Sequence, residues 1–177
     1  MIELAEISEC VDAIKSHNSE YISKTRDIFS ARLESYISSS QKYLEAAILG
    51  ELGNNTFDHN INFNEPFERG VYFNTEYKNG FVIVADFGRG LLDSLRQTQT
   101  HLNNDEDAIK TAFLERVSGR FPESRGNGLK FVLESLIENK WEMFYKSGTA
   151  SVSVSGGKYS FQKDRTEYKG CLAILRF

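Results

Sequence analysis

Apolar residues recur with the period of a helix in the first third of the chain. The pattern is weak over residues 1–26 and strengthens from Asp27 onward. One predicted helix carries its apolar side chains at Phe29, Leu33, Tyr36 and Ile37. A second predicted helix carries them at Leu44, Ala47, Ile48 and Leu52. Residues 60–70 then have the composition of a turn.

The period changes to that of a strand after residue 70. Residues 71–77 and 81–86 are predicted strands, and the Asn79-Gly80 pair between them favours a hairpin turn. The segments expected next are a short helix after Gly90, a polar loop over 97–108, a helix over 109–117 and a Gly- and Arg-containing loop over 119–127.

The last third of the chain combines one amphipathic helix with a run of strands. The helix carries its apolar side chains at Leu129, Val132, Leu133, Leu136 and Ile137. Strands are expected over 142–146, 150–154, 158–162 and 171–177, with a hairpin turn at 155–157. This order of elements predicts an α+β fold, in which one mainly antiparallel sheet carries helices on one face.

Composition narrows the class of protein. A chain of 177 residues with 40% hydrophobic and 26% charged residues is typical of one globular domain. The net charge of −4 gives no general attraction to nucleic acid or anionic membranes, so neither is expected as a partner. No apolar run approaches the ~18 residues that a membrane-spanning helix needs, and the first ten residues are acidic rather than basic. A cytoplasmic location is therefore expected.

The first candidate for chemistry is the pair Glu51 and Asn55, which lie four residues apart and share a helix face. The same face holds Leu44 and Ile48, which suggests an inward carboxylate that something must satisfy. Asn is an uncharged oxygen ligand suited to Mg²⁺, and Glu can polarise a water molecule. The alternative is a boundary helix with a polar edge. Against that alternative, Gly50 and Gly53 each weaken a helix, which indicates a close backbone approach.

The second candidate is Asp86-x-Gly88-x-Gly90, at the end of a predicted strand. A carboxylate only accepts hydrogen bonds, so it suits the exocyclic amine of adenine, which is a donor. Glycines let a flat ring lie against the backbone. One alternative is a plain strand–turn–helix corner. Another is the Rossmann fingerprint, but that needs a third glycine where the chain has Asp93, and a parallel βαβ unit.

The third candidate opens the predicted helix of the last third, at Arg125, Gly126, Asn127, Gly128 and Leu129. Free N–H groups at a helix start favour phosphate, and the arginine adds charged donors. The alternative is a flexible loop between helices. The chain contains no phosphate-binding loop of the G-x-x-x-x-G-K-[ST] type.

Taken in order, these three motifs resemble the N, G1 and G2 boxes of the GHKL superfamily, which includes gyrase and the histidine kinases. The likeness covers about residues 40–177. The pair Gly170-Cys171 resembles part of the last box, where glycine is usually followed by Thr or Ser, so Cys171 departs from the pattern. The resemblance implies a Bergerat-type two-layer fold, with ATP between the helices and a lid.

The resemblance also implies functions for particular residues. Glu51 corresponds to the catalytic base, Asn55 to the Mg²⁺ ligand and Asp86 to the adenine-binding carboxylate. The further nucleotide-binding positions are Asp58, His59, Gly88, Gly90, Arg125, Gly126, Asn127, Gly128, Leu129 and Cys171. The lid corresponds to residues 97–125. Asp58 matches gyrase-like members and His59 matches histidine kinases, so these positions do not select a subfamily.

The implied function is Mg²⁺-dependent binding of ATP or ADP by a stand-alone ATPase domain over residues 41–177. Hydrolysis or phosphotransfer to a partner protein is expected, as in the anti-sigma-type serine kinases, which match the chain in size. Two alternatives stay open: an ATP-gated binding module that is not an enzyme, and a catalytic fragment of a larger sensor kinase. The helical segment over residues 1–40 is expected to dock a partner or form a homodimer, or else to cover the open side of the sheet or helices.

Overall fold

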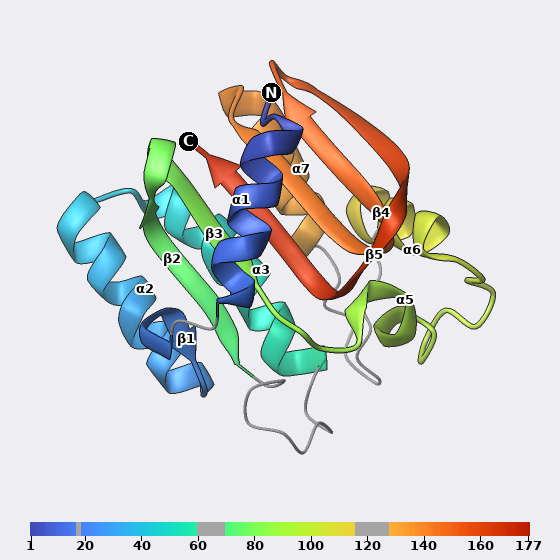
Figure 1. The fold of residues 1–177 in the computed structure, drawn as a ribbon, viewed down its shortest axis with the longest axis horizontal. Helices are drawn as coiled ribbons and strands as arrows, with labels where there is room; N and C mark the ends of the chain where they lie inside the picture. The colour runs from blue at the N-terminus through green and yellow to red at the C-terminus, as the bar shows by residue number, and fades with distance from the viewer. Residues whose placement is uncertain (17–18, 60–69, 116–127) are drawn as a thin grey trace.

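The computed structural model describes residues 1–16, 19–59, 70–115 and 128–177, and it shows an α+β protein with one open sheet (Figure 1). Its helices are α1 (Leu4–Lys15), α2 (Arg26–Ser40), α3 (Tyr43–His59), α5 (Gly90–Leu95), α6 (Asp105–Leu114) and α7 (Gly128–Asn139). Its strands are β1 (Ile22–Ser23), β2 (Val71–Tyr77), β3 (Phe81–Ala85), β4 (Glu142–Ser155) and β5 (Lys158–Arg176). No helix in these ranges is long and apolar enough to cross a bilayer.

The sheet has the strand order β1-β2-β3-β5-β4, and every neighbouring pair is antiparallel. The turn between β2 and β3 is the predicted one, because Asn79 and Gly80 both have the positive φ angles that a tight turn needs. The central strand β3 lies against β5, with Ala85 opposite Leu172. This pairing brings the end of β3, where Asp86 follows, beside the Gly170-Cys171 segment.

The four strands expected at the end of the chain are two long ones. Residues 147–149 form an irregularity within β4, where Gly148 has φ +59°, rather than a break between strands. Opposite them, Gly170 has φ +98° within β5. A bulge bends a strand and lets the pairing continue beyond it. The resulting β4–β5 hairpin extends past the rest of the sheet, as Figure 1 shows.

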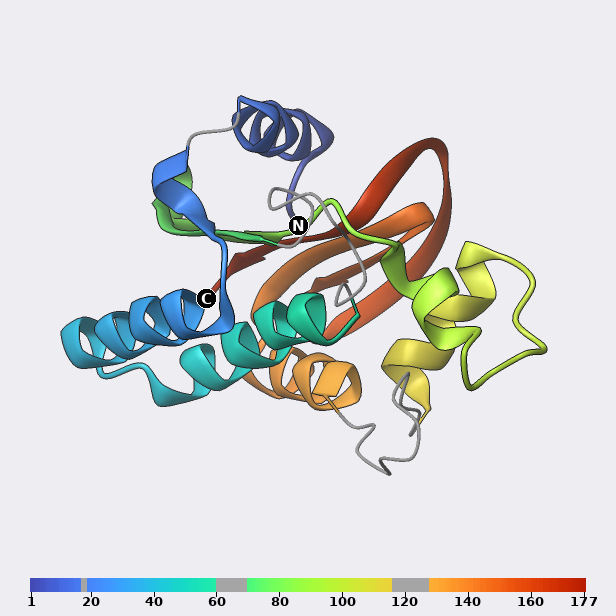
Figure 2. The ribbon, with the colours of Figure 1, turned by 90° about the horizontal axis from the view of Figure 1, so that it is seen from below.

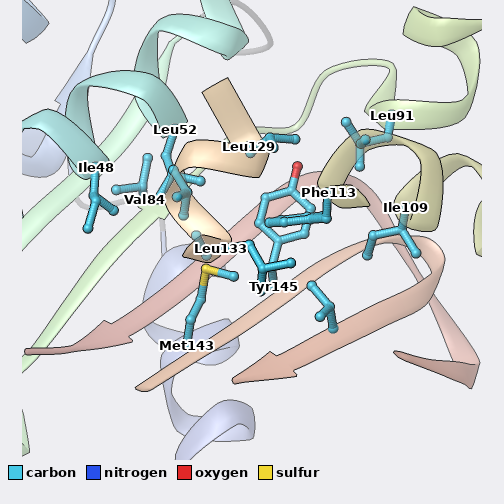
Figure 3. Packing of buried hydrophobic residues seen from close by; sticks show 14 of the residues in the cluster. Ile48, Leu52, Val84, Leu91, Ile109, Phe113, Leu129, Leu133, Met143 and Tyr145 are labelled. Atoms are coloured by element: carbon cyan, nitrogen blue, oxygen red, sulfur yellow. The ribbon is translucent and has the colours of Figure 1, made fainter. Parts of the chain in front are cut away.

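The larger core lies between the sheet and the helices α2, α3, α6 and α7. Figure 3 shows side chains from α3 and α7 meeting those of the sheet, among them Ile48, Leu133 and Met143. The apolar stripe of α3 differs from the prediction, because Leu44 and Ala47 are exposed. The close approach expected at the helix glycines is confirmed. A Cβ on Gly53 would lie 2.2 Å from the ring of Phe29 on α2.

The opposite face of the sheet carries α1, as Figure 2 shows, so the expectation of helices on one face alone is wrong. Cys10 and Ile14 of α1 are fully buried, in a cluster that includes Ile83 and Ile174 of the sheet. The strand alternation explains this packing, because both sides of β3 and β5 carry apolar residues and each needs a cover. Of residues 1–40, α1 covers the open face of the sheet, whereas α2 packs against α3 on the other face. Docking of a partner and dimerisation through this segment stay predictions.

The polar segment before residue 109 also differs from the prediction, because α6 begins at Asp105. The Asn104 side chain caps this helix by accepting a hydrogen bond from the Asp107 N–H at 2.8 Å. The acidic residues of its first turn complement the helix dipole, so polarity here indicates a helix start. Ile109 and Phe113 are fully buried. Within the expected lid, residues 97–104 are turns and loop, residues 105–114 are a helix packed on the core, and residues 116–125 lie outside the described ranges.

Candidate functional site

Asp86 directly follows β3 and is 4% exposed. Its backbone N–H donates to the Cys171 carbonyl at 2.8 Å, which fixes it to β5. The Gly88 N–H donates to Oδ1 at 2.8 Å, and the Thr56 hydroxyl donates to Oδ2 at 2.9 Å. A buried carboxylate costs free energy unless it is hydrogen-bonded, and here neutral donors reach both oxygens. A carboxylate has about four lone-pair sites, and it only accepts hydrogen bonds.

Two glycines beside Asp86 are required by the geometry. Gly170 has φ +98°, and a Cβ there would lie 2.2 Å from the Asp86 carbonyl oxygen. Gly90 has φ +77° at the start of α5, and a Cβ there would lie 2.9 Å from the Ser147 hydroxyl. The backbone at Gly170 therefore lies directly against Asp86, and the backbone at Gly90 lies against Ser147. Glycines from the second motif and from the last strand, Gly90 and Gly170, thus lie close together, since a Cβ on Gly90 would be 3.4 Å from the Gly170 carbonyl oxygen.

Ser147, which the sequence interpretation missed, connects these segments. Its hydroxyl donates to the Gly170 carbonyl at 3.0 Å and accepts from the Leu91 N–H at 2.9 Å. The residue is 3% exposed. It therefore joins the first turn of α5 to β5. No local pattern marks it, because its partners come from segments distant in sequence.

Thr56 was missed as well, although the sequence contains a signal for it. Ile48, Leu52 and Thr56 are spaced by four residues and are all buried, so they form the inward stripe of α3. A polar residue at the end of such a stripe needs a partner, and Asp86 is that partner. The predicted stripe instead places Leu44 and Glu51 on the inward face of the helix, and that choice hides the importance of Thr56.

A small cavity of about 20 Å³ lies between α3, α5, α7 and the sheet. Its lining residues are Leu52, Asn55, Thr56, Asp86, Gly90, Leu91, Ser94, Leu129, Tyr145 and Cys171. The cavity thus joins residues from each of the three motifs and from the last strand. Figure 3 shows Leu52, Leu129 and Tyr145 meeting from three different elements. A space of this size is enough for about one water molecule and is far too small for a purine ring.

The thiol and phenol groups at this cavity are neutral at ordinary pH. Burial is the main reason that the pKa of Cys171 lies well above its usual range, and the nearby Asp86 carboxylate raises this pKa further. Burial likewise holds the pKa of Tyr145 well above its usual range. The Cys171 Sγ lies 3.8 Å from the Ser147 hydroxyl. Asp86 is the one carboxylate among the described residues that line the cavity.

Glu51 does not face inward as predicted. It is exposed, because Leu52 and Thr56 occupy the inward positions of α3. Its carboxylate lies against the first residue of α7, since a Cβ on Gly128 would be 2.4 Å from Glu51 Oε2. Asn55 does line the cavity. Both residues of the first motif therefore lie near the start of α7, Glu51 beside Gly128 and Asn55 at the cavity that Leu129 also lines.

The remaining candidates fall elsewhere or outside the described ranges. Asp58 forms an ion pair with Arg26 of α2, and Arg26 also donates to Asn54 at 3.0 Å. That part of α3 faces α2, so the structure does not bring Asp58 to the cavity. His59 is the last residue of α3. Arg125, Gly126 and Asn127 lie outside the described residues.

A wider hollow of about 500 Å³ lies on the other side of Gly90. It is lined by charged side chains of both signs, namely Arg89, Asp93, Asp105, Glu167 and Lys169, together with backbone glycines. Asp105 is already engaged there, since it accepts from the Thr149 N–H and hydroxyl at 2.8 Å each. The smaller inner cavity, and not this hollow, collects the motif residues.

Comparison with known proteins adds no identification. No protein-family model matches the sequence, and no curated protein matches it either. Within the part of the chain that the structure describes, no group of three or more His, Cys, Asp or Glu side chains is placed to hold a metal ion. What the site can do follows from its own residues: a buried carboxylate, two left-handed glycines and the starts of two helices around one cavity.

Proposed function

We propose that this protein binds ATP as a GHKL-type domain, with the adenine amine donating to Asp86. The observation that carries the proposal is the buried Asp86 carboxylate at a cavity lined by Asn55, Gly90 and Leu129, which come from three separate motifs. The oxygens of Asp86 accept from the neutral donors Thr56 and Gly88, and a carboxylate suits a ligand that donates a hydrogen bond. Adenine presents an amine at the matching position, whereas guanine presents a carbonyl.

Binding requires the cavity to widen, because about 20 Å³ does not hold a purine. Leu91 and Leu129 are the side chains best placed to move. Each lies at the second position of a helix, α5 and α7 respectively, and each lines the cavity. A shift of the first turn of α7 would open the space between Leu129 and Asp86. The fold would then present the ring to the backbone at Gly90.

The start of α7 is the proposed seat of the phosphates, because helix N-termini carry free N–H groups. Bound ATP with Mg²⁺ would supply a transferable γ-phosphoryl group. Asn55 would contribute one oxygen to the metal, whose other ligands would come from phosphates and water. Glu51, beside Gly128, would orient and deprotonate the attacking hydroxyl or water. Its exposed position leaves room for such a molecule.

The proposed activity is ATP hydrolysis or phosphotransfer to a partner protein, as in an anti-sigma-type serine kinase. The position of Glu51 next to the start of α7 favours an enzyme over a passive binding module, because a base there would stand beside the phosphates. Turnover of labelled ATP, alone and with candidate protein partners, separates the two. Release or transfer of phosphate supports the enzyme, and binding without either supports the ATP-gated module.

The site assignment is tested with Asp86→Asn. The amide turns a donor toward the adenine amine or toward the Thr56 and Gly88 donors, so ATP affinity should fall about tenfold to a hundredfold. The matched control is Asp93→Asn, the same change on an α5 carboxylate that is 64% exposed and lies outside the inner cavity. Competition binding with a fluorescent ATP analogue measures both. Equal affinity of Asp86→Asn and wild type would place the nucleotide elsewhere.

A further inference from the structure

Thr56 holds the carboxylate around which the proposed site is built. Its hydroxyl donates to Asp86 Oδ2 at 2.9 Å, and the two residues are each 4% exposed. The other oxygen is held from a different direction by the Gly88 N–H at 2.8 Å. The terminal torsion of an aspartate is soft, so one donor alone leaves the carboxylate free to turn. Two donors from separate elements, α3 and the loop after β3, fix its plane.

The bond from Thr56 also decides which groups a ligand meets. A hydroxyl has one hydrogen, and here that hydrogen is committed to Asp86. At the cavity that both residues line, the Thr56 oxygen and the Asp86 carboxylate can therefore serve a ligand as acceptors. An incoming donor such as the 6-amino group of adenine would find two acceptors. An incoming carbonyl at the same position would face oxygen lone pairs with no hydrogen between them.

The Ser147 hydroxyl and the Cys171 thiol, on the neighbouring strands, have partners other than Asp86. Position 171, on the neighbouring strand, carries a thiol, which is a weak donor. Its Sγ approaches the Ser147 hydroxyl at 3.8 Å instead. The Ser147 hydroxyl donates to the Gly170 carbonyl. Within the described ranges, Thr56 is thus a hydroxyl from α3 that donates directly to the Asp86 carboxylate.

We infer that Thr56 is the positioning residue that sets the base specificity of the nucleotide site, by fixing Asp86 as an acceptor for a 6-amino group. This inference rests on the proposed ATP binding and adds a specific determinant to it. The competing explanation is a structural latch, in which Thr56 only ties α3 to β3. A latch would change the stability of the protein without changing how the site ranks 6-amino and 6-oxo purines.

The experiment compares ATP with ITP, which differ in having an amine or a carbonyl at the 6 position. Wild type should bind ATP more tightly. Thr56→Val keeps the shape but removes the donor, and it should reduce the ATP-to-ITP affinity ratio about fivefold to tenfold. Thr56→Ser keeps the hydroxyl and should retain most of the ratio. Thr111→Val makes the same change at a buried threonine of α6 outside the cavity, and it should leave the ratio unchanged.

Thermal unfolding of each variant is measured beside the binding. If Thr56→Val does not fold, Thr56→Cys makes the same comparison with most of the volume retained and only a weak donor, and its ratio must also fall. A lowered unfolding temperature with an unchanged ATP-to-ITP ratio would establish the latch and overturn the inference, leaving ATP binding intact. Wild type that binds neither nucleotide would overturn the proposed function and the inference with it.

Discussion

At the scale of single residues, the site depends on close backbone contacts around Asp86. Gly170 is the tightest of them, because the Asp86 carbonyl occupies the space of its missing side chain. The sequence contains a signal for this position, since Gly170 follows the pattern of the last motif. The hydroxyl partner of Asp86 is harder to predict. It comes from Thr56, next to a motif residue but outside the motif itself.

Gly170→Ala should destabilise the protein strongly. The new Cβ would lie 2.2 Å from a backbone oxygen and would also carry the strain of φ +98°. We expect a loss of about 3 kcal/mol or more in the free energy of unfolding. Gly156→Ala is the control, because it has φ +58° but no atom within 4 Å of the added Cβ. Urea unfolding of both gives the comparison, and equal losses would show that strain alone, without the clash, determines the effect.

Glu51→Ala should separate binding from chemistry. The residue is exposed, so its removal should leave the unfolding temperature and the affinity for ATP close to wild type. Turnover should fall about 10²–10⁴-fold, as is typical for the loss of a general base. Glu134→Ala, on the exposed side of α7, is the matched control. Wild-type turnover by the Glu51 variant would show that the base is another residue.

At the scale of elements, the sequence predicts those helices and strands whose defining contacts are between residues close together in the chain. The β2–β3 turn and α7 were predicted because their signals are local: the Asn79-Gly80 pair and a helical apolar stripe. The start of α6 was missed because a polar run was interpreted as a loop, although it contains an N-cap. The length of β4 and β5 was missed because a bulge looks like a strand end in the sequence.

The position of α1 could not be predicted from local sequence patterns. Its apolar side packs against a sheet face that is formed by residues distant in the chain. Ile14→Ala should cost about 2–5 kcal/mol of stability, since the residue is 1% exposed in that interface. Leu4→Ala, on the same helix but 84% exposed, should cost little. Chemical denaturation compares the two. A small effect at Ile14 would mean that α1 is not an integral cover of the sheet.

At the scale of the whole molecule, Asp86 at the end of β3 lies at a cavity that the helices α3, α5 and α7 also line. Antiparallel pairing of β3 with β5 brings Asp86 to Gly170, and Ser147 joins both to the start of α5. α3 contributes Asn55 and Thr56, and α7 contributes Leu129. Motifs spread over much of the chain thus converge on one cavity. The narrowness of that cavity is the feature that sequence motifs do not reveal, since it depends on how the helix ends are packed.

The central claim is that this cavity opens to bind an adenine nucleotide. Isothermal titration calorimetry of the wild-type protein with ATP, ADP and GTP, each with and without Mg²⁺, tests it most directly. The account predicts that ATP and ADP bind, that GTP binds at least about tenfold more weakly because its 6-carbonyl meets acceptors, and that Mg²⁺ strengthens ATP binding. Equal affinity for ATP and GTP, or no binding heat with any of them at several temperatures, would contradict it.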